Sequence, residues 1–136
     1  MVYTVAMRML GIDYGSKRVG VAISDEKGDF AMPLKVIANS KKLLDEVVAI
    51  AKEYKTKEIV IGESKNYSGK PNPILAETLE FKKKLEAKGY TVYMEPEFMT
   101  SVQAERFQGK TDMLDASAAA LILQSYLDKE VLKDIL

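Results

Sequence analysis

The stretch of sequence that decides the fold is residues 7–24, which read MRMLGIDYGSKRVGVAIS. Met7 to Tyr14 and Arg18 to Ser24 are both rich in residues that favour β-strands. The short Gly-Ser-Lys segment at Gly15 to Lys17 separates them, and a connection of this length is typical of antiparallel neighbours. The sequence therefore predicts a β-hairpin that opens the fold.

A third strand and a helix are expected to follow this hairpin. A turn at Asp25 to Asp29 precedes Phe30 to Ala38, where we predict the third strand. Asn39 and Ser40 are residue types that cap helices, so we predict a helix from Lys41 to about Tyr54. Its apolar residues recur at the helical period, at Leu44, Val47, Val48 and Ala51.

Strands and helices alternate in the next part of the chain. Glu58 to Gly62 reads as a short buried parallel strand, and Thr91 to Glu95 reads as the last strand. Between them we predict a helix that begins at Asn72 and Pro73 and ends at Gly89. Proline suits the first turn of a helix, and glycine suits the position just after its end.

The remainder, Thr100 to about Leu127, is predicted to form two helices separated near Gly109 to Thr111. The order of elements is then β-β-β-α-β-α-β-α-α. This order predicts the α/β class, with a mixed five-stranded sheet flanked by helices. Its first three strands are antiparallel, and parallel strands follow.

Composition limits the chemistry that this chain can perform. We expect its 136 residues to form one domain, 1–136. Lys plus Arg and Asp plus Glu each number 20, so no net positive charge attracts nucleic acid or an anionic membrane. The absence of Cys and His excludes disulfides, zinc–thiolate sites and the Ser-His-Asp triad. Acid–base or metal chemistry must therefore use carboxylates.

No apolar run reaches the roughly 18 residues that a membrane span needs. The apolar stretch in Met1 to Met9 is too short for a signal peptide. We therefore expect a soluble cytoplasmic protein with no membrane partner.

Asp13 is the first candidate for a functional carboxylate. It follows the apolar residues Leu10, Gly11 and Ile12, and Tyr14 and a glycine come directly after it. Its carboxylate is therefore expected where a central strand leaves the sheet. The alternative is that Asp13 stabilises the hairpin through an Asx-turn.

Asp115 is the second candidate. On a helix it shares one face with Ala118, Ala119 and Ile122, which are three, four and seven residues further along. Burying an ionised carboxylate is costly unless it is paired or binds a metal, and the sequence shows no evident cation at this level of the helix. Asp115 is therefore a candidate metal ligand. The alternative is an acid that stabilises the first turn through the helix dipole.

Glu97 is the third candidate, in the polar segment that follows the last predicted strand. Taken alone it reads as a solvated loop residue. Together with Asp13 and Asp115, however, it completes a set of carboxylates that could hold two divalent ions about 3.5–4 Å apart against a phosphodiester. Mg²⁺ prefers oxygen ligands, so a site without His or Cys is sufficient for it.

The chain resembles a known family over almost its whole length, and two segments carry the resemblance. Residues 11–25, GIDYGSKRVGVAISD, resemble the opening of the YqgF family, which is RuvX-like and has the ribonuclease H fold. Residues 115–127, DASAAALILQSYL, are similar to the closing helix of that family. Its members are bacterial proteins regarded as pre-16S rRNA nucleases or as Holliday junction resolvases. The resemblance implies a ribonuclease H-like fold and a nuclease, a hydrolase that acts on ester bonds.

The resemblance also implies roles for individual residues. Asp13 would be the metal ligand of the first strand, and Asp115 that of the last helix. The family's middle motif is commonly Asp-Glu-Arg-Leu-Thr-Thr, which aligns Glu97 with its Glu, Pro96 with its Asp and Phe98 with its Arg. The missing Arg removes a donor suited to reading phosphate. The family's Gly-x-Pro-x-Asn segment is also altered, to Gly-Glu-Ser-Lys-Asn at residues 62–66.

Several polar residues are candidates for binding phosphate groups of the substrate. Lys17 and Arg18 follow Asp13 closely, and Ser16 and Asn66 could donate hydrogen bonds. Lysines in predicted loops could border the same edge, namely Lys65, Lys70 and Lys110. The alternative is that these charges form solvated surface, and that Ser16 and Asn66 bind local backbone.

The sequence supports a metal-dependent nuclease that uses Mg²⁺ or Mn²⁺ and water to hydrolyse phosphodiester bonds. By resemblance, the substrate is the 5′ end of pre-16S rRNA, in ribosome biogenesis.

One alternative is a Holliday junction resolvase acting on branched DNA, which requires a two-fold dimer. The chain could be a monomer or a homodimer. Another is a nucleic-acid-binding domain with weakened catalysis, because of Pro96 and Phe98. The actin-like ATPases share a similar phosphate loop, but they need two lobes, and this chain has room for one.

Overall fold

The computed structural model describes residues 8–65, 73–98 and 112–135. The elements in these ranges are β1 (Leu10–Tyr14), β2 (Arg18–Ser24), β3 (Ala31–Ala38), α1 (Leu43–Glu53), β4 (Glu58–Lys65), α2 (Pro73–Ala87), β5 (Thr91–Phe98) and α4 (Asp112–Ile135). No helix within these ranges is long and apolar enough to cross a membrane.

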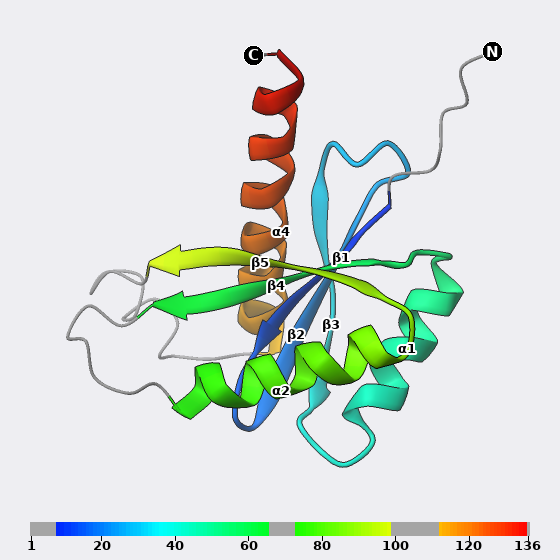
Figure 1. Ribbon diagram of the computed structural model, residues 1–136, viewed down its shortest axis with the longest axis vertical. Helices are drawn as coiled ribbons and strands as arrows, with labels where there is room; N and C mark the ends of the chain where they lie inside the picture. The colour runs from blue at the N-terminus through cyan, green and yellow to red at the C-terminus, as the bar shows by residue number, and fades with distance from the viewer. Residues whose placement is uncertain (1–7, 66–72, 99–111, 136) are drawn as a thin grey trace.

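The five strands form one sheet in the order β3-β2-β1-β4-β5, with β1 at its centre (Figure 1). β1 pairs antiparallel with β2, and β2 pairs antiparallel with β3. β4 pairs parallel with β1, and β5 pairs parallel with β4. This arrangement confirms the predicted mixed sheet, with three antiparallel strands first and parallel strands after them.

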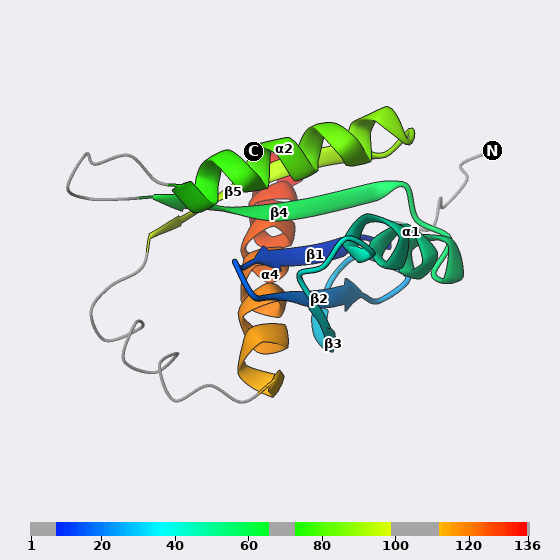
Figure 2. The same cartoon turned by 90° about the horizontal axis from the view of Figure 1, so that it is seen from below.

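Helices cover both faces of the sheet. Strand alternation in β1 and β2 sends Leu10, Ile12 and Val21 to a core shared with α1 and α2. Ala22 of β2 and Val60 of β4 face the other way, toward α4. Figure 2 accordingly shows α4 behind the strands and α1 in front of them. The central strands are therefore buried on both faces, as their apolar sequences predict.

Two glycines allow α4 to lie very close to the sheet. A Cβ atom added at Gly11 would lie 2.7 Å from Cβ of Leu123. A Cβ atom at Gly20 would overlap the carbonyl oxygen of Asp115. Glycine inside a strand often marks such a close backbone approach. The pair thus fixes how far the first half of α4 stands from β1 and β2.

Polar side chains hold α4 to strands at both edges of the sheet. Glu95 of β5 is buried, and its carboxylate accepts hydrogen bonds from Ser125 Oγ at 2.8 Å and Lys129 Nζ at 2.6 Å. The amide oxygen of Gln124 accepts a hydrogen bond from the backbone N–H of Ala31, which begins β3, at 2.8 Å. These contacts oppose sliding of the helix along the sheet.

The start of α1 differs from the prediction. The helix begins at Leu43 instead of Lys41, and its N-cap residue is Lys42, with no capping hydrogen bond from a side chain. Ser40 instead accepts a hydrogen bond from the backbone N–H of Lys42. Asn39 does not cap the helix either, because its amide donates to the carbonyl oxygen of Gly15 at 2.8 Å. The Ser40 bond is a local turn contact, which capping residues often make, whereas the Asn39 bond joins a distant part of the chain, and neither residue caps the helix.

Two strands are longer than predicted. β4 extends to Lys65 and β5 extends to Phe98, and their pairing continues to the register Lys65 with Phe98. The polar residues at these ends did not suggest strands, but parallel neighbours supply the hydrogen bonds that keep them extended. The predicted end of α2 is confirmed: Gly89 has a φ of +96° and follows the helix by two residues. Of the two helices predicted after Thr100, the second is α4, and the first falls outside the described residues.

Candidate active site

Asp13 lies at the end of the central strand, as predicted. It is the second-last residue of β1, it is half-buried, and its antiparallel partner in β2 is Gly20. Alternation along β1 places Asp13 on the same face as Gly11, which contacts α4. Its carboxylate therefore belongs to the face of the sheet that α4 crosses.

Asp115 lies in the first turn of α4 and reaches the same corner. The carbonyl group of Asp115 sits directly on Gly20, the strand partner of Asp13. Cα atoms of directly opposed residues in antiparallel strands are about 5 Å apart, so both acids adjoin one glycine. The predicted helix face is also confirmed, since Ala118, Ala119 and Ile122 are buried. The fold thus brings the backbones of two acids that are about a hundred residues apart in the chain to one corner of the sheet.

An arginine accompanies Asp115, contrary to the expectation from the sequence. Nε of Arg18 lies 2.9 Å from Oδ2 of Asp115, so the expectation that no cation stands at this level of α4 was wrong. Arg18 begins β2, and alternation places it on the face of Gly20, two residues further on. Alternate residues of a strand share one face, so the spacing of Arg18, Gly20 and Ala22 could have predicted that Arg18 faces α4 and pairs with Asp115.

The contact between Arg18 and Asp115 is an ion pair without a hydrogen bond. The 2.9 Å separation is that of two charged groups in direct contact, but Oδ2 has no hydrogen-bond partner among the described residues. Oδ2 is nevertheless buried, and the Asp115 side chain is only 19% exposed. A buried carboxylate oxygen usually has hydrogen-bond donors, so this one retains the capacity to bind a further positive group.

The donors at this corner fit a hard divalent cation. Asp13 and Asp115 offer carboxylate oxygens, which Mg²⁺ and Mn²⁺ prefer, and the buried Oδ2 of Asp115 lacks a hydrogen-bond donor among the described residues. Within the described ranges no three acids lie close enough together to hold a metal ion. A complete site would therefore need a further ligand beyond these two acids.

Glu97 lies inside β5 and not after it, which corrects the sequence analysis. Its backbone is paired with Ser64 of β4, one residue before the strand ends at Phe98. β1, β4 and β5 are parallel, so their carboxyl ends lie at the same end of the sheet. Glu97 therefore lies at the same end of the sheet as Asp13, while its side chain falls outside the described residues.

The hairpin turn beside Asp13 carries the proposed phosphate-binding residues. Ser16 and Lys17 are exposed in this turn, and Arg18 is half-buried. Asn39, which the sequence analysis assigned to a helix cap, holds the turn from the other side. Its side chain donates to the Gly15 carbonyl, and its backbone N–H donates to the Lys17 carbonyl at 2.9 Å.

The other predicted phosphate-binding residues are not placed by the structure. Asn66, Lys70 and Lys110 lie outside the described residues. Lys65 ends β4 at the same sheet edge as Asp13, but its side chain also lies outside what the structure describes.

A mixed sheet with an acid at the end of its central strand, and a second acid on a helix crossing that face, defines a protein with the ribonuclease H-like fold. Solved structures agree on this fold. The chain superposes on Thermus thermophilus RuvC with a TM-score of 0.59 at 14% identity, covering 91% of this chain and 96% of that one. T. thermophilus RuvC in complex with a Holliday junction substrate gives a TM-score of 0.56 at 15% identity, covering 92% and 96%.

Sequence comparison then identifies the family. The model of the RuvX family, described as Holliday junction resolvase, matches residues 7–129, so the chain belongs to the RuvX family, a family of nucleases. A protein of Ruminiclostridium cellulolyticum is 38% identical, with 90% of this chain and 95% of that protein covered. A protein of Streptococcus mutans is 36% identical, with 90% and 99% covered. Both relatives are provisionally named as pre-16S rRNA nucleases.

Proposed function

We propose that this protein is a metal-dependent nuclease of the cytoplasm that processes the 5′ end of pre-16S rRNA during ribosome biogenesis. The observation that carries the proposal is the corner where Asp13 and Asp115 adjoin Gly20, with a buried oxygen of Asp115 that lacks a hydrogen-bond donor among the described residues. The provisional names of the relatives support the choice of rRNA as substrate.

Three acids are proposed to hold Mg²⁺ or Mn²⁺, namely Asp13, Asp115 and Glu97. Divalent ions bound there would activate a water molecule and stabilise the leaving oxygen of the phosphodiester. The role of the carboxylates is to present oxygen ligands that are fixed in position. The close contact of α4 with Gly20 supports this role, because it fixes the backbone of Asp115 against β2.

Arg18 is proposed to pair with Asp115 in the free protein and with a phosphate of the substrate once a metal ion is bound. Its guanidinium pairs with Asp115 and is 40% exposed, so it can also meet a phosphate that approaches from solvent. A cation bound by Asp115 would compete with this ion pair and release Arg18 toward the substrate. Lys17, Ser16 and Asn66 are proposed to contact neighbouring phosphates, and the exposure of Lys17 and Ser16 in the turn supports this for those two.

A second candidate function is cleavage of branched DNA. The description of the matching family model, Holliday junction resolvase, favours it. Symmetric cutting of a junction requires two active sites related by a two-fold axis, and therefore a homodimer. A third candidate is a nucleic-acid-binding domain with weakened catalysis, which Pro96 and Phe98 at the end of β5 suggest.

Cleavage of labelled substrates tests these proposals. Precursor 16S rRNA, single-stranded RNA and a four-way DNA junction are each incubated with the protein in Mg²⁺ or EDTA. We expect Mg²⁺-dependent cutting of the precursor. Asp13→Asn and Asp115→Asn should each reduce it at least 100-fold, since each removes an ionised ligand. Asp45→Asn, an exposed acid on α1, is the matched control and should cut like the wild type.

Each alternative result has a distinct meaning. Selective cutting of the junction would support the resolvase. RNA binding without cutting, by a folded wild-type protein, would support the binding domain. Full activity of both site variants would contradict the proposed metal site.

A further inference from the structure

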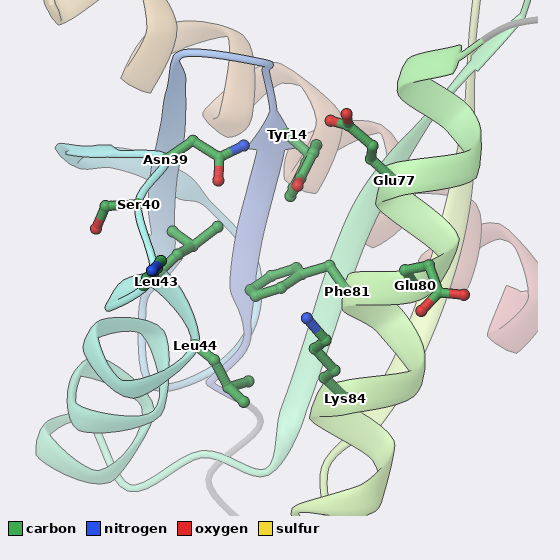
Figure 3. Close-up of a pocket in the computed structure, with 10 residues that line it drawn as sticks. Tyr14, Asn39, Ser40, Leu43, Leu44, Glu77, Glu80, Phe81 and Lys84 are labelled. Atoms are coloured by element: carbon green, nitrogen blue, oxygen red, sulfur yellow. The ribbon is translucent and has the colours of Figure 1, made fainter.

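A pocket opens beside the candidate active site, on the opposite face of the sheet. It lies between β1, the start of α1 and the first half of α2, and its volume is about 290 Å³ (Figure 3). Tyr14 contributes to its wall and is the residue directly after Asp13. Consecutive Cα atoms are 3.8 Å apart, and alternation sends the two side chains to opposite faces. The pocket and the acid therefore share one strand end.

The inner walls of the pocket are apolar and partly aromatic. The rings of Tyr14 and Phe81 lie 5.5 Å apart between centroids and are inclined by 40°. Figure 3 shows Phe81 reaching from α2 toward α1, where Leu43 and Leu44 complete the wall. Phe81 and Leu43 are only 5% and 4% exposed, so the half-buried Tyr14 and Leu44 offer most of the accessible wall. A flat ligand with apolar faces fits this wall, because it can stack on the Tyr14 ring and pack against Leu44.

The rim of the pocket is polar but carries no net charge. Lys41 and Lys84 contribute two positive charges, and Glu77 and Glu80 contribute two negative charges. This balance favours neither a phosphate nor a metal ion. It provides hydrogen-bond donors and acceptors around an apolar interior, as does the hydroxyl of Ser40. A neutral, flat molecule with a polar edge, such as a nucleobase, matches both the walls and the rim.

We infer that this pocket holds an unpaired nucleobase of the substrate strand, close in sequence to the phosphodiester that meets Asp13. The inference rests on the proposed nuclease function and adds a binding subsite to it. Proteins recognise single-stranded RNA by stacking unpaired bases on aromatic rings and by hydrogen-bonding their edges. A strand crossing the end of β1 would place its phosphate on the α4 face and a neighbouring base on the α1–α2 face.

The test measures binding separately from cleavage. Short single-stranded oligoribonucleotides with 2-aminopurine at successive positions are titrated with the protein in EDTA, which prevents metal-dependent cutting. We expect fluorescence quenching at one or two adjacent positions. Tyr14→Ala should remove the quenching and weaken binding about tenfold, as stacking on an aromatic ring contributes roughly this factor per base.

A pair of neighbouring lysines provides a matched control on α2. Lys84 lines the pocket and Lys83 does not, and both are exposed. Lys84→Ala should weaken binding about threefold, the typical effect of one hydrogen bond, whereas Lys83→Ala, with the same change of charge, should not. This comparison remains informative if Tyr14→Ala fails to fold, since neither lysine is part of the core.

Two results would overturn the inference. The first is equal binding and equal quenching in the wild type, Lys83→Ala and Lys84→Ala. The second is displacement of the oligonucleotide by free nucleoside monophosphates of comparable affinity, which would mean that the pocket takes a free nucleotide. In either case Mg²⁺-dependent cutting by the wild type, measured in parallel, would leave the nuclease proposal intact. If the wild type shows the quenching but does not cut RNA, only the nuclease proposal would be contradicted.

Discussion

Among single residues, Arg18 makes the most informative contact of the candidate site. Its Nε lies 2.9 Å from Oδ2 of Asp115, yet this buried oxygen accepts no hydrogen bond from any described residue. An ion pair with a partly exposed partner is weak, because water screens it. Arg18 therefore reduces the charge repulsion at this corner without occupying Asp115 so firmly that a divalent ion could not displace it.

Replacing Arg18 with glutamine should strengthen metal binding and weaken substrate binding. The variant removes the cation that competes for Asp115, so the affinity for Mn²⁺ should rise about two- to fivefold, which corresponds to a weak ion pair. Isothermal titration calorimetry with Mn²⁺, and RNA binding in EDTA, measure the two effects. Lys17→Gln has the same change of charge and should alter only RNA binding. Unchanged Mn²⁺ affinity in Arg18→Gln would show that the arginine does not compete.

At the scale of elements, the contact of α4 with the β1–β2 hairpin determines the site. Gly11 and Gly20 allow backbone and side chains of α4 to lie against the two strands. Both glycines face α4 at different levels of the helix, Gly20 at Asp115 and Gly11 at Leu123. A change at either glycine should therefore affect the stability of the fold, but only Gly20 adjoins Asp13 and Asp115.

Gly20→Ala should separate Asp115 from Asp13. The added methyl group would overlap the Asp115 carbonyl, and overpacking of this kind costs about 1–3 kcal/mol of unfolding free energy. Gly11→Ala should cost a similar amount, because its Cβ would lie 2.7 Å from Leu123 Cβ. Urea denaturation measures both changes. At temperatures where both variants are folded, only Gly20→Ala should lose most of its Mn²⁺ binding. Equal binding in the two variants would contradict this link.

The hairpin, the succession of strands and helices along the chain, and the helix face of Asp115 could be predicted because each depends on a local pattern. The turn at Gly15 to Lys17 and the apolar period of α4 are such patterns. The full lengths of β4 and β5 could not be predicted, since polar residues such as Glu97 remain extended there through pairing with a neighbouring strand. The role of Asn39 also depends on a distant partner, the Gly15 carbonyl.

At the scale of the whole molecule, the two ends of α4 carry different polar side chains. The first turn carries the candidate site, and the second half packs against β4 and β5. Tyr126 of α4 stacks near Tyr93 of β5, with 5.2 Å between ring centroids. Burial, together with the negative charge of Glu130, raises the pKa of Tyr126 from 10.0 to about 12. Burial and the neighbouring Glu58 also raise the pKa of Tyr93.

These tyrosines should make global stability fall in alkali. Between pH 10 and about 12 the unfolded chain loses the Tyr126 proton while the folded protein retains it, so rising pH favours unfolding. The stabilising contribution is complete below pH 10 and is lost as the pH approaches 12. Urea denaturation from pH 8 to 12 measures this dependence. Tyr126→Phe should show a shallower decline than the wild type, and parallel declines would contradict the assignment.

The adjacent positions of Asp13 and Tyr14 also restrict how the length of this region can change. Because side chains alternate along a strand, inserting or deleting one residue in β1 would turn the acid toward Phe81 and the ring toward α4. A two-residue change would restore the faces but move Asp13 away from Gly20. Asn39 binds carbonyls on both sides of the turn, which limits the loop as well. Insertions and deletions in relatives should therefore avoid residues 10–24.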